Sequence, residues 1–232
     1  MTLTTTRRVH HHTPRHRLAP RARRLRDALN VLAVIAALVA INVTAHFSQL
    51  AAVAAVVPIG VMILLFLARV NGMSWRDLGL ARNTHGKGLA YGLGAGVVVV
   101  LGVAVAMALP FTREFFFNES YASLRTAQIA ALVITPLQTV LPEELAFRGV
   151  LPGSLARMGG TKLVFFASSL LFGLWHVASS LNLTASNAGL TAFLGSGTAA
   201  QWAGVGLAVV ATAGAGAGLT WLRHHTGSVI AP

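Results

Sequence analysis

The chain consists of long apolar blocks separated by short polar segments. The blocks cover about residues 28–45, 50–68, 88–109, 127–151, 163–180 and 199–222. A helix that crosses the hydrocarbon core of a bilayer needs about 20 apolar residues, which is close to the length of each block. None of the blocks alternates between apolar and polar residues, as a membrane barrel strand does. The pattern therefore predicts an all-α, polytopic transmembrane helical bundle of about six spans.

The composition supports this prediction and removes several kinds of site. The chain is 55% hydrophobic and only 10% charged, whereas a soluble domain carries about 25% charged residues. The sequence contains no cysteine. Disulfides, thiol catalysis and cysteine-based zinc sites are therefore excluded.

The positive charge is concentrated at one end of the chain. The formal net charge is +12, and eight of the 18 Lys and Arg residues lie directly before the first apolar block. Such a segment is typical of a juxtamembrane tail that is attracted to anionic lipid, and we expect no nucleic-acid partner. We predict a disordered, basic cytoplasmic tail over residues 1–27 and a transmembrane domain over residues 28–232.

The other basic residues predict how the spans are oriented. With the N-terminus inside, fifteen Lys and Arg residues lie on the inner side and two, Arg113 and Arg125, on the outer side. Cytoplasmic loops carry the excess of Lys and Arg in membrane proteins. We therefore predict a multi-pass protein of the cell membrane with a cytoplasmic N-terminus.

The fourth apolar block contains the charged motif PEELAFRG, residues 142–149. It places two of the chain's six acidic residues side by side, with an arginine four positions after the second. Each charge costs at least about 2.5–3.5 kcal/mol at the centre of a transmembrane helix. An ionisable group at this depth is a functional-site hypothesis by default.

Helical geometry separates the two carboxylates of this motif. Glu144 and Arg148 are four residues apart, so they share a helix face and can form an ion pair. Glu143 projects about 100° away from Glu144 and is left free to act as a general base. The alternative is a purely structural ion pair that locks the bundle, with Glu143 in a water cavity.

His176 is the histidine that lies well inside an apolar block, the fifth. Taken alone, it is better explained by a hydrogen bond between helices than by catalysis. The loop between the fourth and fifth blocks is short, however, so the two spans are expected to be antiparallel neighbours. Glu143 and His176 could then deprotonate a water molecule together for attack on a carbonyl group.

Metal binding is a competing chemistry for the same residues. Catalytic zinc takes three protein ligands and a water molecule, and Glu143, Glu144 and His176 could supply the three. Glu144 is also expected to form an ion pair with Arg148. Zinc therefore remains an alternative, and we assign no ligands to it. Two other polar side chains receive plainer interpretations: Trp175 as a packing or interface anchor, and Asn42 as a residue that reaches the membrane interface.

Two motifs together resemble a known family. EELAFRG, followed about thirty residues later by FGLWH, resembles the EExxxR and FxxxH motifs of the CPBP family. This family contains the CAAX prenyl endopeptidases and the bacteriocin-processing or immunity proteins, also called Abi proteins. The resemblance extends from roughly Ser74 to the C-terminus, with the core motifs within residues 127–180.

The resemblance implies a reaction and a role for each motif residue. Glu143 resembles the family's water-activating glutamate and His176 its partner, while Glu144 and Arg148 resemble the residues that shape and support the site. The implied activity is that of a CAAX-type intramembrane endopeptidase, which hydrolyses a peptide bond of a membrane-associated or lipidated substrate. Family members have been described both as metalloproteases and as glutamate-dependent proteases.

One element of the family pattern is absent from this sequence. The family usually has a third motif, a His followed four positions later by Asn or Asp, on a span entered through a sequence like TGSVIAP. Here the sequence stops at Pro232. For a chain that ends there we expect absent or weak peptidase activity, because the group that polarises the substrate carbonyl is missing.

Two alternatives to an endopeptidase follow from the same residues. One is a non-catalytic membrane protein of the same fold, with an immunity or binding role. The other is a transporter or proton relay that uses Glu143 and Glu144. Inverted repeats, which are typical of many transporters, are not visible in the sequence and weigh against the second alternative.

Overall fold

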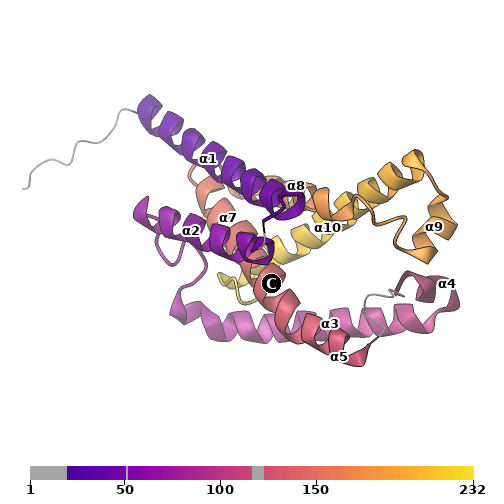
Figure 1. Ribbon diagram of the computed structural model, residues 1–232. Coiled ribbons are helices and arrows are strands. Elements are labelled where there is room, and N and C mark those ends of the chain that lie inside the picture. Colours follow the sequence, from indigo (N-terminus) through magenta and orange to yellow (C-terminus); the bar gives the residue numbers. More distant parts are fainter. Residues whose placement is uncertain (1–19, 51, 117–122) are drawn as a thin grey trace, which may run out of the picture.

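The computed structural model describes residues 20–50, 52–116 and 123–232. Over these ranges the regular elements are all helices (Figure 1). Five of them are long and apolar enough to cross a membrane: Pro20–Phe47 (α1), Val53–Val70 (η1 with α2, Val56–Val70), Arg82–Ala108 (η2 with α3, His85–Ala108), Leu124–Leu155 and Thr198–Thr226 (α10). The predicted polytopic helical bundle is therefore confirmed.

Two of the expected elements differ at their ends. Helix α1 begins at Pro20, so residues 20–27, which were expected in the disordered tail, are helical; residues 1–19 lie outside the described residues. The fifth span corresponds to α8, Thr161–Trp175, which ends before His176. Its 15 residues extend about 22 Å, less than the ~30 Å hydrocarbon core of a bilayer. The fifth predicted span is thus a shorter apolar helix.

The fourth span, Leu124–Leu155, is one helix with changing winding. It runs through α5 (Leu124–Ile129), η5 (Ala130–Val140), α6 (Leu141–Glu144), η6 (Leu145–Val150) and α7 (Leu151–Leu155). The segments η5 and η6 are π-helical and flank α6, which carries both glutamates. Pro136 and Pro142 cannot donate a backbone hydrogen bond, so they interrupt the regular ladder here. Wide π turns inside α-helices often occur at functional sites.

The C-terminal half of this span is the centre of the molecule. Every residue from Leu145 to Leu155 is buried, whereas Leu132 and Leu137 in the N-terminal half are largely exposed. The buried part packs against α1, α2, α8 and α10, and Figure 1 shows α7 between these helices. A helix that is buried on all sides belongs to the core of a bundle.

Small residues bring α8 and α10 close together. A Cβ atom at Gly173 would lie 2.6 Å from the carbonyl oxygen of Val209, and one at Gly216 would lie 3.0 Å from the Phe172 ring. Small residues at a helix interface allow such close packing. This contact fixes the C-terminal end of α8 against the rest of the bundle.

A stripe of glycines on α3, Gly88 and Gly92, packs against the C-terminal segment of the chain. Residues 228–231 lie against these glycines, where an added Cβ would meet Ser228, Ile230 and Ala231. Ser228 and Ala231 are almost fully buried, and the backbone N–H of Val229 donates to the carbonyl of Gly79. The glycine stripe therefore lets the backbone of the C-terminal segment approach α3 closely, because glycine has no side chain in the way.

We expect Gly92→Leu to destabilise the protein by roughly 1–3 kcal/mol through overpacking. A side chain at Gly92 would lie 3.0 Å from the carbonyl oxygens of Ile230 and Ala231. Gly94→Leu is the matched control, because nothing lies within 4 Å of its added Cβ. Thermal unfolding in detergent measures the difference, and equal melting temperatures for the two variants would contradict the expectation.

Candidate active site

The two adjacent glutamates project to different partners, as helical geometry predicted. The Oε1 atom of Glu144 lies 3.3 Å from Nη1 of Arg148, and the Arg148 side chain is 1% exposed. This is the predicted ion pair between positions four residues apart. It places one positive and one negative charge together inside the buried half of the fourth span.

Arg148 is held in the core mainly by charge and by an aromatic ring. Its guanidinium carbon lies 3.9 Å from the centroid of the Phe172 ring on α8, a cation–π contact. Its three guanidinium nitrogens have no hydrogen-bond partner within the described part of the chain. Glu144 is therefore the main compensation for this buried charge.

The backbone of the motif is tied to α10 by Arg223. Its Nε donates to the carbonyl of Arg148 over 3.0 Å, and its Nη2 donates to the carbonyl of Asp77 over 3.1 Å. Asp77 belongs to the loop after α2, where it exchanges hydrogen bonds with Ser74. Burial raises the pKa of Asp77, but the Ser74 hydrogen bonds and the cations Arg157 and Arg223 outweigh burial and lower it overall. This loop and α10 together hold the charged motif from one side.

Glu143 faces the C-terminal end of α8. Its Oε1 accepts a hydrogen bond of 2.8 Å from the indole Nε1–H of Trp175. His176 directly follows Trp175 in the chain, at the residue where α8 ends. The structure therefore brings Glu143 and the predicted histidine to the same place, with Trp175 as the direct contact.

His176 is the residue at which α8 ends, and its ring orientation is fixed. Nδ1 lies 2.8 Å from the carbonyl oxygen of Phe172. A carbonyl only accepts, so Nδ1 carries the proton in this bond. In the neutral ring Nε2 then keeps a free lone pair, and the ring packs edge-on against Phe172. Nε2 is the atom that can accept a proton or a hydrogen bond from a substrate water.

Two residues at this site were not predicted. Trp175, interpreted as a packing or interface anchor, donates to Glu143. Asn42 of α1, expected to reach the interface, is buried, and its Nδ2 donates to the carbonyl of Trp175 over 2.9 Å. Two features of the sequence could have indicated these residues. Trp175 is adjacent to His176, and the amide of Asn42 is costly within an apolar block unless it is hydrogen-bonded.

The residues of this site do not form a metal centre in the described geometry. No three His, Asp or Glu side chains within residues 20–50, 52–116 and 123–232 gather closely enough to hold an ion. Glu144 is paired with Arg148, and Glu143 accepts from Trp175. The ligand set Glu143, Glu144 and His176, considered for zinc, is thus not assembled, and we derive no step through a metal.

An apolar cavity of about 220 Å³ borders the site between α1 and α8. Asn42 and Trp175 line it at the side of the candidate site. The remaining lining is apolar: Ile35, Leu38, Val39, Val43, Phe147, Leu171 and Leu174. This cavity can receive a hydrocarbon group next to the residue that contacts Glu143.

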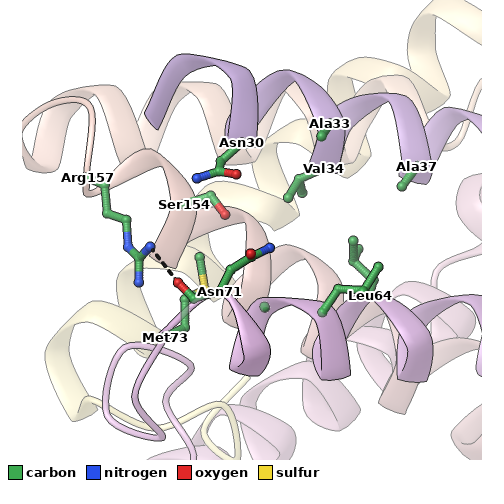
Figure 2. Close-up of a pocket in the computed structure, with 11 residues that line it drawn as sticks. Asn30, Ala33, Val34, Ala37, Leu64, Asn71, Met73, Ser154 and Arg157 are labelled. Atoms are coloured by element: carbon green, nitrogen blue, oxygen red, sulfur yellow. Dashed lines mark hydrogen bonds between the residues drawn. The ribbon is translucent and has the colours of Figure 1, made fainter. Parts of the chain in front are cut away.

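A second cavity, of about 120 Å³, lies apart from these residues between α1, α2 and α7 (Figure 2). Asn30, Ser154 and Arg157 are among the residues around it, and Arg157 donates to the backbone carbonyl of Asn71 over 3.3 Å. None of Glu143, Glu144, Arg148 and His176 lines this cavity. It is therefore not the candidate active site.

Comparison with known proteins identifies the segment that carries the site. Residues 125–232 match the family model described as type II CAAX prenyl endopeptidase Rce1-like. This segment is therefore similar to the CAAX prenyl endopeptidases. It contains both motifs, EELAFRG and FGLWH, so the resemblance found from those motifs is confirmed. Neither the comparison with curated proteins nor that with solved structures gives a match.

Proposed function

We propose that this protein is an intramembrane endopeptidase that hydrolyses a peptide bond of a membrane-associated or lipidated substrate. The observation that carries the proposal is the contact of Glu143 with Trp175 at the end of α8, directly beside His176 in the chain. Glu143 and His176 both lie in the segment that matches the CAAX protease family. A carboxylate and an imidazole at one place can activate water for attack on a carbonyl group.

The reaction follows from the two protein groups. Water gives a proton to the Glu143 carboxylate while the water oxygen forms a bond to the scissile carbonyl carbon. Nε2 of His176 accepts a hydrogen bond from the same water and orients it. The tetrahedral intermediate then loses its C–N bond as the leaving nitrogen takes the proton from Glu143. The products are a carboxylic acid and an amine, and Glu144 stays paired with Arg148 throughout.

The cavity beside Trp175 supports a lipidated substrate. Its walls are almost wholly apolar, and it lies between two helices of the bundle, α1 and α8. A hydrocarbon chain placed there would leave the attached peptide next to Glu143. Binding energy from a remote group of this kind orients the peptide at the reacting atoms.

The proposal is tested with the purified full chain in lipid nanodiscs. A peptide that ends in a prenylated cysteine tail is incubated with the protein, and its fragments are identified by mass spectrometry. The same peptide without the prenyl group is the control. We expect weak cleavage of the prenylated peptide and still slower cleavage of the control. Failure to cleave either peptide would contradict an endopeptidase and favour a binding role for the fold.

Filling the cavity should weaken substrate binding. Val39 lines the cavity and is 56% exposed, so a larger side chain is accommodated without repacking the core. We expect Val39→Phe to raise KM for the prenylated peptide about tenfold, with kcat nearly unchanged. Val98→Phe is the matched control on α3, where Val98 is 69% exposed and lines none of the described cavities. Equal KM values for both variants would place the lipid group elsewhere.

The proposed orientation, with a cytoplasmic N-terminus, can be tested because the chain has no cysteine. Single cysteines are introduced at Asn83, before α3, and at Ser123, before α5, which are both exposed. A membrane-impermeant maleimide should label the Ser123→Cys variant in intact cells, and the Asn83→Cys variant only after permeabilisation. The opposite labelling pattern would reverse the orientation.

A further inference from the structure

We propose that Asn42 and Trp175 are positioning residues for Glu143. Together they form a hydrogen-bonded relay that runs from α1 through the end of α8 to the carboxylate. Its effect on catalysis rests on the proposed endopeptidase function. The relay itself is a property of the fold and can be tested without any substrate.

The relay begins at the C-terminal end of α8, where backbone carbonyl groups need hydrogen-bond donors from outside the helix. The last carbonyl groups of a helix have no donors within that helix, and each unsatisfied group is costly in hydrocarbon. At the end of α8, the Phe172 carbonyl accepts from the His176 ring, and the Gly173 and Leu174 carbonyls accept from the backbone beyond Trp175. The Trp175 carbonyl accepts from Asn42, which belongs to another span.

The position of Asn42 on α1 shows that its amide serves this bond. Val31 and Leu38 precede it by eleven and four residues and are also buried, so the three share the inward face of the helix. An amide side chain at membrane depth is favourable only when it is hydrogen-bonded. Asn42 meets that condition through the Trp175 carbonyl, and it thereby ties the end of α8 to α1.

Trp175 links Asn42 to the carboxylate of Glu143. Its backbone is held by Asn42, its ring packs edge-on against Phe147 at 5.3 Å between centroids, and its Nε1–H donates to Oε1 of Glu143. One carboxylate oxygen is thus fixed by the indole, and Oε2 is left to take the proton from water. Catalytic groups need such fixed geometry, because an error of about 1 Å can cost up to about 100-fold in rate.

Replacing the donor should lower turnover more than binding. We expect Asn42→Leu, which is close in volume and preserves the bordering cavity, to lower kcat about tenfold or more with KM within about twofold. Asn42→Gln retains an amide donor and should restore part of the rate. Asn30→Leu removes an asparagine from the same helix at the other cavity, away from the relay, and should leave kcat unchanged.

A spectroscopic measurement tests the relay independently of cleavage. The chain has four tryptophans, so ¹⁵N-tryptophan labelling gives four indole N–H signals, and Trp175→Phe identifies the one from Trp175. We expect Glu143→Gln and Asn42→Leu each to shift this signal, while Asn30→Leu leaves it in place. Should Asn42→Leu not fold, Asn42→Ala provides the same two measurements.

The outcomes separate the relay from the proposed function. If Asn42→Leu leaves both the Trp175 signal and kcat at wild-type values, the relay is wrong even though the enzyme is active. If the wild type cleaves nothing but Asn42→Leu still shifts the Trp175 signal, the relay stands and the endopeptidase proposal fails. A shifted signal together with a lower kcat, partly restored by Asn42→Gln, supports both.

Discussion

Glu143→Gln is expected to lower kcat for peptide cleavage by about 10²–10⁴-fold. The amide cannot accept a proton from water, whereas its oxygen can still accept the hydrogen bond from Trp175. The substitution therefore removes the proton acceptor with little change in shape. The rate is measured on the prenylated peptide with the purified chain in nanodiscs, and the melting temperature shows that the variant is folded.

The matched control is Glu114→Gln, which makes the same chemical change at an exposed glutamate after α4 (Pro110–Arg113), 29 residues before Glu143. Its rate should equal that of the wild type. His176→Ala should also lower kcat, because His176 directly follows Trp175 at the end of α8 and its Nε2 is not used in the hydrogen bond to Phe172. If Glu143→Gln cleaved as fast as Glu114→Gln, Glu143 could not be the general base.

Arg148→Met is expected to destabilise the protein by about 3–5 kcal/mol, the usual result of breaking a buried ion pair. The reason is that Glu144 would be left as an uncompensated charge in the core, and the contact of the guanidinium with Phe172 would be lost. The free energy of unfolding is measured in detergent by chemical denaturation. The loss should be visible in the absence of substrate.

A double variant separates the charge effect from loss of packing. In Glu144→Met/Arg148→Met both charges are removed, so much of the stability lost in the single variant should return. Arg157→Met serves as control, since Arg157 is half-buried and makes one hydrogen bond to a backbone carbonyl; we expect a change within about 1.5 kcal/mol. A double variant as unstable as Arg148→Met would show that packing around Arg148, rather than charge, holds the core.

The two predictions assign different work to neighbouring carboxylates. Glu143 should control turnover with little effect on stability, and Glu144 should control stability through Arg148. This division follows from their partners: an indole N–H at the end of α8 for Glu143, and a buried guanidinium on its own helix for Glu144. Measuring kcat and unfolding on the same set of variants tests the division directly.

The local features of this protein were determined by its sequence. Apolar blocks of spanning length predicted the long helices, and a spacing of four residues predicted the pair Glu144 and Arg148. Two short motifs were enough to indicate the family that residues 125–232 match. These features depend on helical periodicity and on the cost of charge in hydrocarbon, which act within a few turns of one helix.

The tertiary structure alone decided what surrounds the catalytic candidate. Asn42 and Trp175 are 133 residues apart, and Trp175 and Glu143 are 32 apart. Hydropathy cannot show that α8 ends at Trp175, because the next residues are also weakly polar or apolar. Nor can hydropathy show that the glycine stripe on α3 packs against the C-terminal segment. Such contacts depend on how helices that are distant in sequence pack together. The sequence of an apolar block does not determine which neighbouring helix its few polar groups will contact.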